Sequence, residues 1–138
     1  MPLTPELIAA YEKADYVVFG DPEVVLHVGE KNPRLDYLVG WLGRKTAAFV
    51  TAVNPRGSVL PERDNRRAME ALRGSQFEPG TTVMPGEARD PDGAWPVEPS
   101  LLIVGISRAD AEALGRRFGQ NAIVFVEKGQ AAELVVLA

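Results

Sequence analysis

Apolar residues recur at helical spacing at the start of the chain and alternate with polar ones in the segment that follows. Thr4 as N-cap and Pro5 at the first helical position precede apolar side chains three and four residues apart, which predicts a helix over residues 1–14. Residues 16–19 and 23–28 are rich in β-branched and aromatic side chains and flank a Gly-Asp-Pro turn, so we predict a β-hairpin. We expect the first helix to pack as a lid or as an edge helix.

The middle of the chain predicts a strand, a loop and a helix in succession. A short helix over 33–42 precedes a strand over 47–53, and the loop 54–60 leads into a helix over 61–73. The segment 77–100 holds five of the eleven prolines and most of the local acidic residues, so we interpret it as a proline-rich acidic loop or an irregular hairpin.

The last third of the chain has the clearest pattern. Residues 101–106 form a continuous apolar run, typical of a strand buried on both faces. Ser107 then begins a helix, and 122–126 returns as a strand that we expect to lie parallel to the first. A turn at 127–130 and a strand at 134–137 predict a closing hairpin.

Together these elements predict one α+β domain over residues 1–138. We expect a mixed sheet of five to seven strands with helices mainly on one face, and a parallel β-α-β unit at 101–126 near its centre. A chain of 138 residues with 46% hydrophobic and 25% charged residues can bury a core of its own.

Composition excludes several kinds of site. The chain has no cysteine and one histidine, which excludes disulfides, thiolate catalysis and any site that needs two imidazoles. No apolar run approaches the length of a membrane span and the first residues lack a basic region, so we expect a soluble cytoplasmic protein without membrane contact.

The net charge of -4 is unevenly distributed along the chain. Residues 54–76 carry five basic and three acidic side chains, whereas 77–100 carry one basic and five acidic ones. An acidic chain argues against general nucleic-acid binding, but the basic segment permits a local anion site.

The loop 54–60 and the helix after it form the first candidate site. A loop that leaves a strand and enters a helix offers free backbone N–H groups and the positive end of the helix dipole. Arg56 and Arg66 add positive charge, and Asn54 and Asn65 add directional hydrogen bonds. The alternative is that the two asparagines satisfy turn and cap donors while the arginines form a solvated helix face.

The acidic segment and the turn before the last strands provide the second group of candidates. Trp95 is either an apolar wall for a ligand or an anchor for the proline-rich loop, and Glu98 is either an acid–base group or half of a structural ion pair. The Gln120 amide either caps helix carbonyls or reaches the Asn54 loop. The spacing of the acidic residues in 77–100 fits no calcium loop, so we expect no metal site. We also expect no cofactor.

Several short motifs resemble a family of small bacterial proteins catalogued as domain of unknown function 3293. The resemblance covers roughly residues 14–136, and it brings no established reaction, cofactor or catalytic residue. Its recurrent pattern implies that five positions matter in this chain: Asn54, Asn65, Trp95, Glu98 and Gln120. The matching segments are Thr51-Ala52-Val53-Asn54-Pro55, Gly93-Ala94-Trp95-Pro96-Val97-Glu98-Pro99-Ser100, Gly105-Ile106 and Phe118-Gly119-Gln120-Asn121-Ala122-Ile123.

Three functions follow as hypotheses. The first is binding of a small anionic or polar ligand at the loop 54–60 and helix 61–73, which predicts that the candidate side chains converge on one concavity. The second is a protein-interaction or accessory module, with a possible homodimer through the strand edge near residue 137. The third is a hydrolase that uses Glu98, which we rank last because no complete set of nucleophile, base and orienting group is present.

Overall fold

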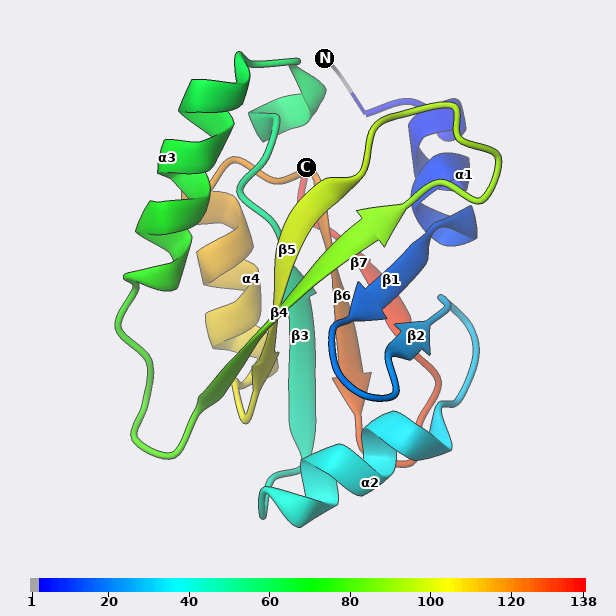
Figure 1. Ribbon diagram of the computed structural model, residues 1–138, viewed down its shortest axis with the longest axis vertical. Helices are drawn as coiled ribbons and strands as arrows, with labels where there is room; N and C mark the ends of the chain where they lie inside the picture. Colours follow the sequence, from blue (N-terminus) through cyan, green and yellow to red (C-terminus); the bar gives the residue numbers. More distant parts are fainter. Residues whose placement is uncertain (1–2) are drawn as a thin grey trace.

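The computed structural model describes residues 3–138, which form an α+β fold around a seven-stranded sheet (Figure 1). Four α-helices lie against this sheet, with α3 and α4 together on one side of it in Figure 1. The elements in chain order are α1 (Pro5–Lys13), β1 (Asp15–Val18), β2 (Val24–Leu26), α2 (Pro33–Trp41), β3 (Thr46–Val50), the 3-10 turn η1 (Pro55–Gly57), α3 (Glu62–Arg73), β4 (Thr82–Arg89), β5 (Glu98–Val104), α4 (Arg108–Arg117), β6 (Ala122–Glu127) and β7 (Glu133–Val136).

Short polar side chains begin three of the helices. Thr4, Asn32 and Ser107 each accept a hydrogen bond from the backbone amide three residues further along, at 3.0–3.1 Å. Each bond satisfies one of the amides that the first turn of a helix leaves without an intrahelical partner. The helix starts predicted from the sequence are therefore confirmed. Within residues 3–138, no helix has the length and apolar character needed to cross a membrane.

The strands follow the order β2-β1-β4-β5-β3-β6-β7, and every neighbouring pair of strands is antiparallel. The predictions of a mixed sheet and of a parallel β-α-β unit at 101–126 are therefore wrong. Strands β5 and β6 are both bonded to β3, which lies between them and runs opposite to both. The apolar run at 101–106 indicates a strand that is buried on both faces, but it carries no information about which strand lies next to it.

The two faces of the sheet pack against different helices. Along β3, Ala47 and Phe49 belong to one apolar cluster, and Ala48 and Val50 to the other, because successive side chains point to opposite faces. Helices α3 and α4 cover the second face, and α2 packs on the first. The helices contribute these buried side chains: Leu35 and Val39 from α2, Met69 and Leu72 from α3, and Ala111 and Leu114 from α4.

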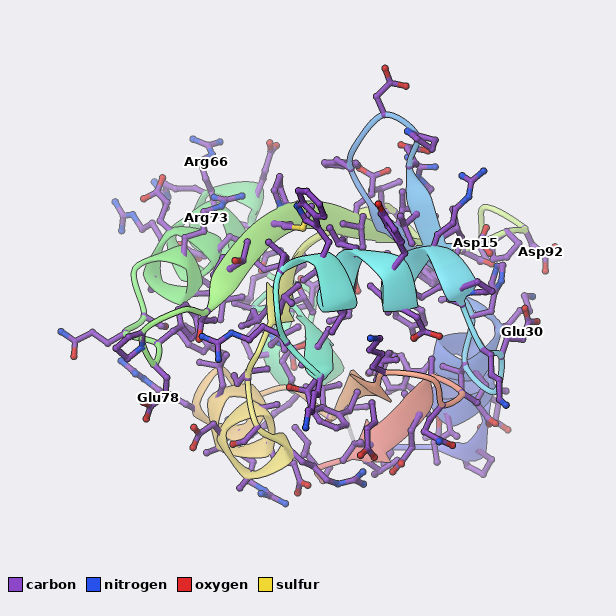
Figure 2. The ribbon with its side chains drawn as sticks, turned by 90° about the horizontal axis from the view of Figure 1, so that it is seen from below. Asp15, Glu30, Arg66, Arg73, Glu78 and Asp92 are labelled. Carbon is purple, nitrogen blue, oxygen red and sulfur yellow. The ribbon has the colours of Figure 1, made fainter. Side chains whose placement is uncertain are left out.

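The sheet curls until its two edges touch at one end. Val28, just after β2, forms an isolated bridge with Ala132, just before β7. The Gly29 amide donates to Ala132 O at 2.8 Å, and the Ala132 amide donates to Glu30 O at 3.0 Å. Helix α2 lies across this end of the curl (Figure 2), and its Leu35 and Val39 fill the concave face there.

The proline-rich segment 77–100 forms strand β4, a turn and the start of β5. Its turn is closed by the Gly93 amide, which donates to Asp90 O at 3.0 Å. Of the two interpretations of this segment, the structure has the hairpin. The sequence did not predict the full length of strand β4, because Pro85 and Gly86 within it are both unfavourable for strands. The register pairs Ala88 with Glu98, so this hairpin places Glu98 beside the concave face.

Gly86 is required by a close approach of β4 to β1. A Cβ atom at this position would lie 2.2 Å from Val17 O and 3.3 Å from the Phe49 ring. We predict that Gly86→Ala lowers the free energy of unfolding by about 1–3 kcal/mol, measured by urea denaturation, because backbone must move to admit the methyl group. The control is Gly74→Ala, whose Cβ would come no closer than 3.4 Å to Glu70 O. Equal stability of the two variants would contradict the packing described here.

Candidate functional site

A cavity of about 230 Å³ lies on the concave face, at the end of the sheet opposite α2. Helix α1 covers it with Leu7, Ala10 and Tyr11. Most of the lining is apolar, and it comes from strands on both sides of the curl. The strand residues that line it are Tyr16, Phe49, Ala88, Glu98, Ser100, Ala122, Ile123, Val124 and Leu134.

Three segments that are far apart in sequence supply the polar lining. They are 51–54 after β3, 98–100 at the start of β5, and 120–121 just before β6. Because β5 and β6 are antiparallel to β3, the end of β3 lies beside the beginnings of both neighbours. The sheet topology thus brings Asn54, Glu98 and Gln120 to one cavity.

Asn54 is held in a defined orientation by Asn65 of α3. Its backbone amide donates to Asn65 Oδ1 at 2.9 Å, and Asn65 Nδ2 donates back to Asn54 Oδ1 at 2.8 Å. The Leu60 amide also donates to Asn54 Oδ1, at 3.0 Å. With its oxygen occupied in this way, Asn54 turns Nδ2 toward Glu98 Oε2, 3.4 Å away. Asn54 has a left-handed backbone (φ 49°), a conformation that asparagine tolerates better than most residues.

Glu98 is the only charged side chain among the described residues that line the cavity. Burial raises the pKa of Glu98, and the hydrogen bond from Asn54 opposes this increase by favouring the ionised form. Burial also raises the pKa of Tyr11, whose hydroxyl accepts a hydrogen bond from Asn121 Nδ2 at 3.5 Å. The pKa of the more deeply buried Tyr16 is raised for the same reason. Both phenols are therefore neutral at pH 7.

Trp95 and Gln120 complete the set of predicted residues that border the cavity. Trp95 is half-buried in the connection between β4 and β5 and packs against the apolar cluster of the concave face. Gln120 Nε2 lies 3.3 Å from both Val53 O and Phe118 O. The Gln120 amide therefore caps a carbonyl at the end of α4 and also reaches the segment beside the Asn54 loop.

The two predicted arginines lie outside the cavity lining. Arg66 is exposed on α3, where it lies 3.8 Å from Glu62, and Figure 2 shows it projecting away from the sheet. Arg56 is also exposed and has a left-handed backbone, and its amide donates to Gly119 O at 2.6 Å. Of the seven candidates, Asn54, Trp95, Glu98 and Gln120 border the cavity and Asn65 positions Asn54; Arg56 and Arg66 do neither.

Sequence reasoning missed the aromatic side chains of the lining other than Trp95. The helical spacing of Tyr11 indicated an apolar helix face, and Tyr16 and Phe49 lie in strand patterns that indicate core. Only the curl of the sheet shows that these rings face a shared space. The expectation that the first helix packs as a lid was the one indication in the sequence that Tyr11 could line a cavity.

The hydroxyl groups near Glu98 donate hydrogen bonds to backbone carbonyls. Thr51 Oγ1 donates to Pro99 O at 2.7 Å, and Ser100 Oγ donates to Glu98 O at 3.0 Å. Among residues 3–138, no cluster of three or more carboxylate or imidazole side chains is placed to hold a metal ion. The cavity therefore combines apolar walls, fixed amides and one carboxylate.

The predicted dimer edge lies on β7, an outer strand of the sheet. The chain just before β7 is covered by its bonds with Gly29 and Glu30, and the Leu137 amide donates to Asn121 O at 2.8 Å. Pairing with a second copy along the rest of this strand stays a prediction.

A model of the family described as "Protein of unknown function (DUF3293)" matches residues 50–123 of the chain. No curated protein and no solved structure matches it. The matched range runs from the end of β3 to the beginning of β6 and includes all seven candidate residues. It therefore covers the polar part of the cavity, whereas α1 precedes it.

Asn65 is predicted to stabilise the Asn54 loop. Replacing Asn65 with Ala leaves the Asn54 amide without its acceptor, so we expect a loss of about 1–3 kcal/mol in the free energy of unfolding, measured by urea denaturation. Arg66→Ala, one residue further along the same helix, is the control and should change it by less than about 0.5 kcal/mol. A larger loss in the control would show that helix α3, and not the asparagine pair, supports the loop.

Glu98 is predicted to make stability fall as pH rises. Its pKa is raised in the folded state above the ordinary 4.5, so its protonated form favours folding, and that contribution is lost as pH rises through the folded pKa. Glu98→Gln should therefore be more stable than the natural protein at pH 7, with the difference shrinking toward pH 4.5. Thermal unfolding across this pH range, with the exposed Glu12→Gln as control, measures it. A variant that is less stable at pH 7 would refute the assignment.

Proposed function

The chain belongs to the family of proteins of unknown function DUF3293, and because that description names no activity, we propose from the geometry that it binds a small polar organic molecule in the cavity beneath α1. The observation that carries this proposal is the convergence of Asn54, Glu98 and Gln120 on one largely apolar cavity. Pockets of this kind, with apolar walls and a few placed polar groups, are typical of small-molecule sites.

The size of the cavity limits the ligand. An engineered apolar cavity of roughly 150 Å³ binds benzene. The 230 Å³ found here therefore corresponds to a ring or a short branched chain that carries one polar substituent, on the order of ten non-hydrogen atoms. Tyr16, Phe49 and Leu134 would contact its apolar part.

The polar end of the ligand is expected at Asn54 and Glu98. Asn65 fixes the Asn54 amide before any ligand arrives, which reduces the ordering cost of binding. Burial desolvates Glu98, so a ligand that donates a hydrogen bond to its carboxylate offsets a penalty that the protein already carries.

An anionic ligand receives less support from this geometry. Within residues 3–138 no Lys, Arg or His side chain lines the cavity, and Glu98 would repel an anion. The proposal therefore keeps the polar ligand and the contribution of Asn54 from the loop 54–60. Anion binding by Arg56 and Arg66 at the start of α3 stays a prediction.

Hydrolysis with Glu98 as general base is a second candidate function. It is favoured by one observation, a half-buried carboxylate with a raised pKa beside open space. The hydroxyl groups of Thr51 and Ser100 are engaged in hydrogen bonds to backbone carbonyls. A water molecule activated by Glu98 would therefore be the nucleophile.

A protein-interaction role is supported by a different surface, on helix α2. Tyr37 and Trp41 lie one turn apart on α2 and are 73% and 76% exposed, which is unusual for large aromatic side chains. This pair lies on the opposite end of the sheet from the cavity, so the interaction role stays a separate prediction.

Blocking the cavity from α1 is the direct test of the proposal. Ala10 lines the cavity on a helix without fully buried side chains, so Ala10→Trp should fill the space without disturbing the core. We expect benzyl alcohol to bind the natural protein saturably in an NMR titration, and its affinity to fall at least about tenfold in this variant, or by about 1.4 kcal/mol.

Ala9→Trp is the matched control, because Ala9 is exposed on the same helix. It should bind benzyl alcohol as the natural protein does. Saturable binding that is unaffected by Ala10→Trp would place the ligand elsewhere and overturn the proposal.

A further inference from the structure

We infer that the molecule bound in this cavity is a small organic ammonium ion. The inference rests on the proposed binding function and adds the charge and chemical class of the ligand. Two features of the described residues carry it: a single carboxylate without a cationic partner, and aromatic rings around the same space. The carboxylate is that of Glu98, and the rings are those of Tyr11, Tyr16, Phe49 and Trp95.

The carboxylate lacks charge compensation. The one hydrogen bond that its oxygens receive from the described residues comes from Asn54 Nδ2, at the long distance of 3.4 Å. No ion pair among residues 3–138 includes Glu98. Burial without a counter-ion disfavours the ionised form, which is the cause of its raised pKa. An ammonium group would supply the missing positive charge and donate hydrogen bonds to the same oxygens.

The aromatic rings favour the same ligand. The face of an aromatic ring carries partial negative charge, and cavities lined by several rings recognise organic ammonium ions by this attraction. Tyr16 and Phe49 already meet edge to face, with centroids 5.3 Å apart, so their positions are fixed by packing. Trp95, the residue type with the strongest attraction for cations, comes from the loop that leads into Glu98.

The volume of the cavity suits a free small molecule, because a ligand of about ten non-hydrogen atoms fits beneath α1. Helix α1 lines one side of the cavity and is tied to the sheet by Tyr16 Oη, which donates to Tyr11 O at 2.5 Å. An ion pair between Lys13 and Asp92 holds the end of the same helix to the β4–β5 turn.

Glu98 is the only carboxylate among the described residues that face the cavity. The titratable side chains of the lining are Tyr11 from α1, Tyr16 from β1 and Glu98 from β5, and the pKa values of both tyrosines are raised above 10. Affinity for an ammonium ion should therefore weaken as pH falls through the pKa of Glu98, while affinity for a neutral analogue stays constant.

Benzylamine and benzyl alcohol provide a matched test, because they differ in charge but hardly in size. In calorimetric titrations of the full chain at pH 7, we expect benzylamine to bind at least about tenfold more tightly than benzyl alcohol, and benzoate most weakly. In Glu98→Gln this preference should disappear, because benzylamine loses its counter-ion and its affinity falls to that of benzyl alcohol. Glu12→Gln removes the same charge from the exposed side of α1 and should keep the preference.

The outcomes separate this inference from the function on which it rests. If both compounds bind equally well, if benzoate binds most tightly, or if the preference survives in Glu98→Gln, the ammonium inference is overturned and the cavity remains a ligand site. If neither compound binds the natural protein, the proposed function and the inference are overturned together.

Discussion

The hydrogen-bonded pairing of β3 with β5 along one side and β6 along the other organises the rest of the structure. It sets the end of β3 beside the beginnings of two strands that lie some fifty and seventy residues further along the chain. Asn54 follows β3, Glu98 begins β5 and Gln120 lies just before β6, so their meeting is a consequence of antiparallel registry. Asn65 of α3 is hydrogen-bonded to the loop after β3 and orients Asn54 there.

Side-chain size divides the concave face into a packed end and an open end. At the α2 end, Leu35 and Val39 are fully buried and fill the curl. At the α1 end, the small side chains of Ala88 and Ser100 leave room that α1 covers without contributing a fully buried side chain. Helix α1 therefore borders the cavity without being part of the packed core.

Glu98 places an electrostatic cost at this open end. A half-buried carboxylate without a cationic partner among the described residues disfavours its ionised form, as the raised pKa of Glu98 indicates. A glutamine of the same shape could accept the Asn54 hydrogen bond without that cost. Residues that reduce stability while lining a cavity are typical of functional sites. The fixed amide of Asn54 limits the cost and gives the carboxylate one defined orientation.

Local chemistry along the chain determined the helix starts, the α+β class and which polar residues deserved consideration. The caps at Thr4 and Ser107 depend only on side chains and amides three residues apart, so sequence alone predicted them. Tertiary structure alone decided that β3 separates β5 from β6, that Arg66 points to solvent, and that Tyr11 joins Glu98 around one cavity. These features depend on strand neighbours and on the curl of the sheet, which arise from contacts between distant segments and leave no periodic signal in the sequence.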